Sequence, residues 1–325
     1  FVGRTYGFKE ERLCQDKKYQ HDRIRLGYVS GDLCVHAVGL LLAELLEGHD
    51  KNKFEIYAYD FSPEDGTPHR QRLKQAVEHI RFVHALTDRQ VAELILYDEI
   101  DVLVDLHGLS AGARPGVFAL HPAPLQGTYL GFIGTTAMPW FDFVLTDHKA
   151  FPTDLEPYFA EKPVYLQRSF IPLTPDDQQP LLLSRDQFGF QADSFVMAAF
   201  GNSYKFTPEM FSVWLALVEA IPHAVLWLVD DNVAATANLK AFAYQHGVAM
   251  DRIVFTPRAN YDEYKQRLKI ADVFLDTYPY NCGSTTNNVI QAGLPMVTMY
   301  GRTMVSRMGL SILGALGLDQ YCVNR

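Results

Sequence analysis

The chain has 325 residues, of which 48% are hydrophobic and 21% charged, so it is long enough for two globular domains and is not of the disordered class. Its formal net charge of −9 argues against a broad nucleic-acid-binding surface, which needs a basic face. No apolar run approaches the roughly 20 residues of a membrane span. Four widely separated cysteines predict free thiols and a cytoplasmic protein, and the first residue, Phe1, suggests a piece of a longer chain.

Strand and helix patterns alternate from residue 23 onward, after an N-terminal extension of residues 1–22. Strands alternating with helices predict parallel sheets in a layered α/β fold. We assign residues 23–171 to a first Rossmann-like lobe. Its predicted strands are Ile24–Ser30, Phe54–Tyr59, Arg81–Val83, Val102–Leu106, Leu125–Gly131, Phe143–Thr146 and Pro163–Leu166, and its predicted helices are Ala37–Leu46, Arg70–Glu78 and Arg89–Tyr97.

A proline-rich segment without periodicity, residues 172–184, predicts a linker. The alternating pattern then restarts, and we assign residues 185–325 to a second Rossmann-like lobe. Two such lobes facing a cleft place ligands beyond the carboxyl ends of the strands. The elements predicted in this lobe are the helix Pro208–Ala220 and the strands Phe195–Phe200, Ala224–Val229, Ile253–Thr256, Ala271–Leu275 and Met296–Met299.

Several common nucleotide-binding motifs are absent from the sequence. It has no G-x-G-x-x-G and no G-x-x-x-x-G-K-[ST], which disfavours a dinucleotide dehydrogenase and a P-loop nucleotidase. It also has no Asp-x-Asp, a common means of holding a metal against a sugar diphosphate. A diphosphate would therefore be bound by backbone amides, hydroxyls and a cation.

The loop after the strand Ala271–Leu275 fits an anion. It runs from Asp276 through Pro279 and Gly283 to the hydroxyl residues 284–286, where a helical segment begins. Backbone N–H groups at a helix start, together with the helix dipole, favour a diphosphate. A capped strand-to-helix loop with no ligand is the alternative interpretation.

A second loop supplies the candidate cation. Asn202 and Lys205 follow the strand Phe195–Phe200, and Thr207 and Pro208 are suited to the N-cap and first turn of the next helix. Both loops lie at the carboxyl edge of the predicted sheet. Lys205 could neutralise charge on a leaving phosphate, although an ordinary solvated lysine is the alternative.

Two histidines and two tyrosines complete the candidate groups. His36, after the first strand, could accept a proton near neutral pH, or could be structural. Asp105 and His107 could form a hydrogen-bonded pair or, with His36, part of a metal site, although no regular ligand spacing supports a metal. Tyr261 and Tyr264 could stack on a nucleobase or pack on a neighbouring helix.

These motifs together resemble a known family. The sequence resembles the catalytic region of O-linked N-acetylglucosamine transferases and their Spindly-like relatives, glycosyltransferase family 41, over about residues 23–320. The residues that carry the resemblance, in order, are Gly27–Ser30, Asp32, His36, Gly112–Arg114, Phe118–Pro124, Leu130, Gly131, Gly134, Thr135, Asn202, Lys205, Asp276, Thr277, Pro279–Asn281 and Ser284–Thr286.

The resemblance implies a GT-B fold and an inverting, metal-independent transfer of GlcNAc from UDP-GlcNAc to Ser or Thr of a protein acceptor, with no cofactor. By position, His36 would be the base, with His107 as the other candidate, and Lys205 would hold the diphosphate. Ala259 would face the base through its backbone, and Tyr264 would stack on it. The full set of implied nucleotide-sugar contacts is Asn202, Lys205, Ala259, Tyr261, Tyr264, Arg267, Gly283, Ser284, Thr285 and Asn288.

The sequence departs from the family pattern at three positions. Asn288 stands where the family usually has an acidic residue that binds the ribose, Tyr264 where animal members have histidine, and His107 where relatives often have other polar residues. Family members carry tetratricopeptide repeats before this region, so we expect repeats in the full-length chain. Transfer of fucose from GDP-fucose, glucosylation of asparagine, and a non-catalytic nucleotide-sugar-binding scaffold are the alternative functions.

Overall fold

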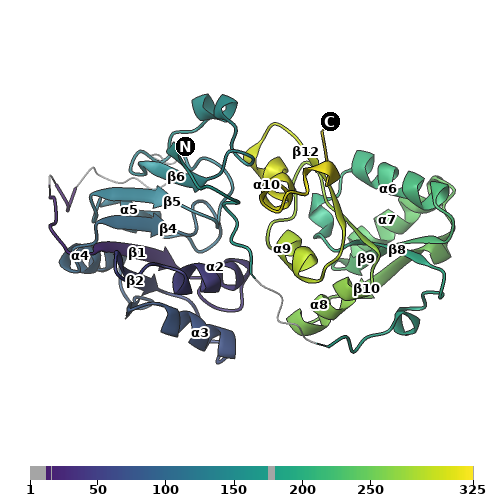
Figure 1. Ribbon diagram of the computed structural model, residues 1–325, viewed down its shortest axis with the longest axis horizontal. Helices are drawn as coiled ribbons and strands as arrows, with labels where there is room; N and C mark the ends of the chain where they lie inside the picture. The colour runs from purple at the N-terminus through teal and green to yellow at the C-terminus, as the bar shows by residue number, and fades with distance from the viewer. Residues whose placement is uncertain (1–11, 16, 175–179, 325) are drawn as a thin grey trace. The chain divides into compact units, whose positions relative to one another are not determined.

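The computed structural model describes residues 12–15, 17–174 and 180–324 and divides the chain into two compact units, Phe1–Leu173 and Thr174–Arg325 (Figure 1). The division lies inside the predicted linker. The described linker residues after it are attached to the second unit, since Leu182 N–H donates to Gln266 and Thr174 bonds Asn287. In the predicted extension, Leu13 and Cys14 donate to backbone carbonyls of the first unit.

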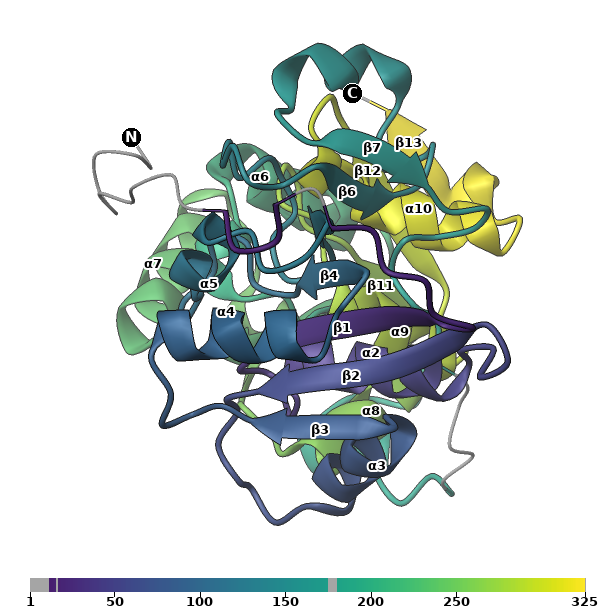
Figure 2. The same ribbon diagram turned by 90° about the vertical axis from the view of Figure 1, so that its left-hand side faces the viewer.

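The first unit contains a parallel sheet in the order β3-β2-β1-β4-β5-β6-β7. Helices α2 and α3 pack together, as do α4 and α5, and the two pairs cover opposite faces of the sheet (Figure 2). The strands are β1 (Ile24–Ser30), β2 (Phe54–Asp60), β3 (His79–Phe82), β4 (Val102–Asp105), β5 (Leu125–Thr128), β6 (Phe143–Thr146) and β7 (Lys162–Tyr165). The helices are α2 (Ala37–Glu47), α3 (Pro68–Ala76), α4 (Asp88–Tyr97), α5 (Pro115–Ala119) and the 3₁₀ helix η1 (Thr153–Tyr158).

The second unit repeats this architecture with a parallel sheet in the order β10-β9-β8-β11-β12-β13. Its strands are β8 (Phe195–Ala199), β9 (Ala224–Asp230), β10 (Ile253–Pro257), β11 (Val273–Leu275), β12 (Met296–Tyr300) and β13 (Cys322–Asn324). Its α-helices are α6 (Pro208–Ala220), α7 (Val233–Gln245), α8 (Tyr261–Lys269), α9 (Ser284–Gln291) and α10 (Met308–Ala315). Its 3₁₀ helices are η2 (Arg185–Phe188), η3 (Ser203–Lys205), η4 (Met250–Arg252), η5 (Met304–Arg307) and η6 (Asp319–Tyr321).

Local sequence signals explain where the helices begin. Thr207 caps α6 by accepting from Met210 N–H at 3.2 Å, and Pro208 occupies the first turn, as predicted. His36 caps α2 in the same way through Nδ1, so its side chain is fixed at the end of the loop after β1. Thr87 and Gln90 form a capping box at α4.

The two units have separate hydrophobic cores. The first centres on strand residues such as Tyr59 and Leu103, packed on α4 and α5. In the second, Trp227 is fully buried among the rings of Phe188, Phe190 and Phe200. Burial of these side chains on both faces of each sheet explains why the strands read as apolar runs.

The predicted α/β class and parallel sheets are confirmed, with shifts at some element boundaries. Strand β3 begins at His79 instead of Arg81, and α3 begins at Pro68 instead of Arg70, because Thr67 caps that helix. The helices α5, α7, α8 and α10 and the edge strand β13 were not predicted. Helix α5 is only five residues long, and β13 has three residues that are mostly exposed. No helix in the described part of the chain is long and apolar enough to cross a membrane.

Candidate functional site

Each sheet has a topological switch point beside its first strand. In the first unit the order reverses between β1 and β4, and in the second between β8 and β11. At such points the loops after the two strands diverge and leave a binding crevice at the carboxyl ends. We call residues 201–207 and 276–283, which follow β8 and β11, the switch-point loops of the second unit.

Lys205 joins these two switch-point loops. It ends the 3₁₀ helix η3, and its Nζ donates to Asn281 O at 3.2 Å. The same ammonium lies 3.9 Å from the centroid of the Tyr280 ring. No carboxylate within the described residues pairs with Lys205, so its positive charge is held at the switch point without being neutralised there.

Asp276 holds the second switch-point loop from inside. Its carboxylate accepts from Thr277 N–H and Cys282 N–H, each at 2.8 Å, and from Thr298 Oγ1 at 2.6 Å. Burial raises the pKa of Asp276 to about 6, although these donors oppose the shift. The loop that receives Lys205 is therefore shaped by a buried carboxyl group.

The start of helix α9 presents backbone donors beside this loop. Gly283 precedes the helix and gives it no side-chain cap, which leaves the first N–H groups available to an anion. Ser284 and Thr285 are partly exposed, whereas Thr286 is buried and donates to Cys282 O at 2.6 Å. Of the three hydroxyl residues, the first two can face a ligand and the third closes the loop.

Asn202 lies between the loops after β8 and β10. Its Oδ1 accepts from the Arg258 guanidinium, which also pairs with Asp231 at 3.4 Å. Asp231 in turn accepts from Ser203 N–H at 3.0 Å. Asp231 and Arg258 were missed from the sequence, although each directly follows the end of a strand, the position at which this fold places ligand contacts.

Tyr261, Tyr264 and Asn288 converge between α8 and α9. Tyr261 OH donates to Asn288 Oδ1 at 2.9 Å. Tyr264 packs at 6.2 Å from the Phe200 ring, and burial raises the pKa of its phenol while the side chains of Thr285 and Asn288 oppose that rise. The tyrosines thus contact a neighbouring helix, and the stacking on a base stays a prediction.

Arg267 and Ala259 flank the loop after β10. Arg267 is buried, donates to Pro257 O at 2.7 Å and pairs with Glu263 at 2.6 Å. The structure therefore shows Arg267 supporting the backbone that leads to Ala259, which is partly buried. A direct nucleotide contact of either residue stays a prediction.

His36 is the more accessible of the two candidate bases in the first unit. It lies in the loop after β1, and 49% of its side chain is exposed. Its Nδ1 accepts from Val38 N–H and lies 3.4 Å from Asp32 Oδ2. An exposed imidazole beside a carboxylate can take a proton from an incoming hydroxyl.

His107, after β4, is 2% exposed and is used inside the fold. Its Nε2 accepts from Gly31 N–H at 2.8 Å, so in the neutral ring Nδ1 donates to Ser110 Oγ at 3.0 Å. Burial lowers the pKa of His107, although Asp32 opposes the shift. A neutral His107 with its basic nitrogen occupied fixes the turn that leads to His36.

The expected pairing of Asp105 with His107 takes a different form. The Asp105 carboxylate accepts from the backbone N–H groups of His107 and Gly108, at 3.0 and 2.8 Å, and burial raises its pKa to about 7. The carboxylate therefore shapes the turn rather than orienting the imidazole. Within the described residues, no three His, Cys, Asp or Glu side chains are grouped so that they could hold a metal.

A buried ion pair supports the loop that leads from β1 to His36. Arg70 pairs with Asp60 at 2.6 Å and donates to Leu33 O at 2.6 Å, with both charged side chains almost fully buried. Neither residue was singled out from the sequence. A regular helix position such as Arg70 gives no sign that its side chain reaches a distant loop.

Two parallel-sheet units, each with polar residues at its switch point, define the GT-B class of glycosyltransferase folds. The profile of glycosyl transferase family 41 matches residues 5–175 and 174–325. The chain belongs to this family.

Curated and solved relatives agree with this assignment. The chain is 33% identical over 302 residues, 91% of its length, to the probable UDP-N-acetylglucosamine–peptide N-acetylglucosaminyltransferase SEC of Arabidopsis thaliana. It is 24% identical to the UDP-N-acetylglucosamine–peptide N-acetylglucosaminyltransferase of Caenorhabditis elegans, with 92% of the chain covered. It spans 31% and 36% of these two proteins.

Among solved structures, a mutant O-GlcNAc transferase of Thermobaculum terrenum matches with a TM-score of 0.84 and 31% identity, over 93% of this chain and 57% of that one. Anabaena HepE, solved with UDP-glucose, matches over 92% of this chain and 98% of its own with a TM-score of 0.55 and 12% identity. At that identity the likeness to HepE shows the fold alone.

Proposed function

We propose that this chain is the catalytic region of a protein O-glycosyltransferase that transfers GlcNAc from UDP-GlcNAc to Ser or Thr hydroxyls, with inversion and without a metal. The observation that carries the proposal is the switch point of the second unit, where Lys205 bridges the two loops beside the start of α9. The names of the relatives from Arabidopsis, Caenorhabditis and Thermobaculum, all transferases of N-acetylglucosamine, support the choice of donor and acceptor.

In this mechanism, the acceptor oxygen forms a bond to the anomeric carbon while the bond from that carbon to the phosphate oxygen breaks. UDP leaves with the bonding electrons, and negative charge grows on its β-phosphate. The Lys205 ammonium and the first N–H groups of α9 stabilise this charge, because both are already fixed in place before the reaction.

The hydroxyl proton goes to a base or to water. We propose His36 for this role because its ring is half-exposed, whereas the ring of His107 is buried. In this view His107 is a positioning residue that fixes the loop between β1 and His36. The assignment is checked by measuring turnover against pH: the fall on the acidic side of the profile should disappear in His36→Gln.

The ribose and base would lie on the α8 side of the switch point. Asn288 and Tyr261 form a hydrogen-bonded pair there that can offer an amide and a phenol to the ribose. Asp231, with Arg258, lies where the loops after β8 and β9 meet, and a carboxylate accepts well from the N–H groups of guanine. GDP, as the product of a GDP-fucose donor, is therefore the second nucleotide to test.

The test is a calorimetric titration of the chain with UDP and, separately, with GDP, both in EDTA. Tight binding of UDP and weak binding of GDP support the proposal, and acceptor screening with UDP-GlcNAc follows. The reverse preference supports protein O-fucosylation. Binding of neither nucleotide contradicts the enzyme assignment and favours a scaffold. Lys205→Met, with Lys240→Met on α7 as the matched control, shows whether the nucleotide occupies the switch point.

We also propose that the full-length protein carries tetratricopeptide repeats before this region and acts in the cytoplasm on protein acceptors. The span of only about a third of the curated relatives supports further segments in the whole protein. Sequencing of the complete transcript and fractionation of cells that express the full-length protein test these two points.

A further inference from the structure

A pocket of about 560 Å³ lies at the carboxyl end of β12, outside the set of residues implied in donor binding. Arg302 and Arg307 line it, and no aspartate or glutamate stands among the described residues of its wall. The formal net charge of the chain is −9, so two arginines in the wall of one pocket run against the overall charge. Such a pocket favours an anion.

The two arginines are held differently. Arg307 Nη1 donates to Gly301 O at 2.8 Å, and its guanidinium lies 5.1 Å from the centroid of the Tyr300 ring. This places one cation in a fixed orientation at the wall. Arg302 is exposed and makes no hydrogen bond or ion pair with any residue that the structure describes, so it can turn onto a ligand without breaking a contact.

Neutral donors complete the pocket. The side-chain hydroxyls of Tyr278 and Tyr300 and the amide of Asn324 line it, and none of them bonds another side chain within the described residues. With the guanidinium groups, these donors outnumber the acceptor sites of one carboxylate. A phosphate monoester, with three acceptor oxygens and up to two negative charges, matches this set better.

The pocket is distinct from the switch point although one loop borders both. Tyr280 and Asn281 contact Lys205, whereas Tyr278 and Pro279 line the pocket on the β12 side. Strand β12 neighbours β11 in the parallel sheet, so both sites open at its carboxyl edge. A ligand in the pocket would therefore leave Lys205 in place.

We propose that Arg302 and Arg307 form a second anion site that binds a phosphate monoester, either free or on a phosphorylated side chain of a protein. The site does not depend on the identity of the sugar donor. The phosphate would bind to the same structural unit that carries the switch-point loops.

The experiment measures binding of three probes to the full chain: inorganic phosphate, a serine peptide, and the same peptide with phosphoserine. Each titration is done with saturating UDP and repeated with Lys205→Met, so that occupancy of the switch point is not mistaken for this pocket. Failure of UDP binding would contradict the proposed function and leave the Lys205→Met titrations to decide this proposal alone.

The expected result is saturable binding of a phosphate-bearing probe that Arg302→Gln weakens by about tenfold to a hundredfold. Arg302→Lys should keep part of the affinity, because it keeps the charge but loses the planar fork. Arg89→Gln, at an exposed position of α4 in the first unit, should bind like wild type. Unchanged melting temperatures show that Arg302, an exposed loop residue, is not needed for folding.

The probes separate the two sources of phosphate. Equal affinity for inorganic phosphate and phosphopeptide supports a free phosphate ligand, and tighter binding of the phosphopeptide alone supports a phosphorylated protein. Equal affinity of Arg302→Gln and wild type for every probe, or no binding of any probe to wild type, overturns the proposal.

Discussion

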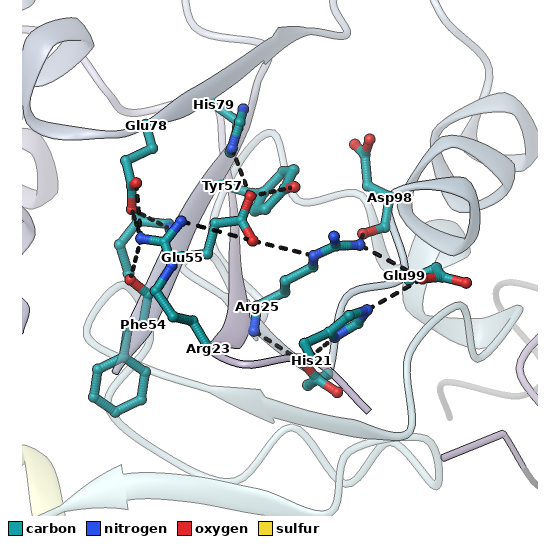
Figure 3. Close-up of polar contacts among 12 residues, drawn as sticks. His21, Arg23, Arg25, Phe54, Glu55, Tyr57, Glu78, His79, Asp98 and Glu99 are labelled. Carbon is teal, nitrogen blue, oxygen red and sulfur yellow. Dashed lines mark hydrogen bonds and ion pairs between the residues drawn. The ribbon is translucent and has the colours of Figure 1, made fainter. Parts of the chain in front are cut away.

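Two regions of the molecule gather charged side chains at opposite ends of their strands and use them differently. At the amino ends of β1 to β4, ten residues form what we call the amino-edge cluster (Figure 3): His21, Arg23, Arg25, Glu55, Tyr57, Glu78, His79, Asp98, Glu99 and Asp101. At the switch point of the second unit, Lys205 bonds only a carbonyl and an aromatic ring.

Every cation in the amino-edge cluster has an anionic partner. Arg23 pairs with Glu78 at 2.9 Å and Arg25 with Glu55 at 3.2 Å (Figure 3). His21 pairs with Asp101 at 3.0 Å. Charges that neutralise one another hold strand ends together but leave little net charge to attract a ligand. A cation such as Lys205, placed without a carboxylate, adds little to stability and is available for the charge of a diphosphate.

Removing the unpaired cation should give the largest change in activity and almost none in stability. Lys205→Met is expected to lower turnover by about 10²- to 10³-fold, because it removes a preorganised positive charge. The free energy of unfolding should change by no more than about 0.5 kcal/mol. Transfer of radiolabelled GlcNAc to protein and urea unfolding measure the two effects.

Lys240→Met, an exposed lysine on α7, serves as the control for loss of one charge and should behave like wild type. Turnover that survives Lys205→Met would remove the lysine from the mechanism. A loss of several kcal/mol in stability would show that the switch point, like the amino-edge cluster, is held together by its charge.

The sequence predicted the fold better than it predicted the interior of the site. Apolar runs mark nearly all of the strands because both faces of each sheet are covered, and the caps at Thr207 and Thr67 depend on residues next to the helix. Lys205 and residues 283–285 were found because they lie in or at the end of loops that follow strands, a position set by chain order alone.

Contacts between distant segments could not be predicted in this way. Arg70 reaches Leu33 across 37 positions, and Arg258 reaches Asn202 across 56, with no local pattern to mark either pair. The sequence also could not separate His36 from His107, because exposure decides between them and exposure depends on tertiary packing. Resemblance to a family supplies the position of a residue but not its burial.

Removing His107 should behave like removal of a structural group, in contrast to Lys205. His107→Gln is expected to lower the free energy of unfolding by about 2 kcal/mol, because Gly31 N–H loses a well-placed buried acceptor. Urea unfolding of wild type and variant measures this loss of stability. His36→Gln, at a half-exposed position, should change stability by less than about 0.5 kcal/mol and is the matched control. If His107→Gln is fully stable yet inactive, the buried histidine acts in the chemistry and the assignment to His36 fails.

Giving the switch point a negative partner for the ribose should sharpen donor binding. Asn288→Asp is expected to tighten UDP binding by about fivefold to tenfold, since a carboxylate makes stronger hydrogen bonds to hydroxyls and can still accept from Tyr261. Calorimetry measures the change, and Asn238→Asp, at an exposed position of α7, controls for the added charge. Weaker binding would mean that repulsion from the diphosphate exceeds the gain at the ribose.

The smallest expected effect lies in the amino-edge cluster and depends on pH. Burial opposes the shift, but hydrogen bonds to Asp101 and Glu99 raise the pKa of His21 above its ordinary value of about 6.5 (Figure 3). The folded state therefore holds this proton more tightly than the unfolded chain does. Its contribution to stability is fully present below about pH 6.5 and is lost as the pH rises through the raised pKa.

His21→Gln should therefore cost about 1 kcal/mol at pH 5.5 and progressively less toward pH 8.5. Urea unfolding of wild type and variant across this range measures the difference, and His84→Gln, an exposed histidine of the same unit, should show none. A difference that grows with pH would mean that burial outweighs the two carboxylates at His21. His21 would then be a neutral histidine inside the amino-edge cluster. The contrast between a cluster of paired charges and Lys205 without a carboxylate would not hold at this position.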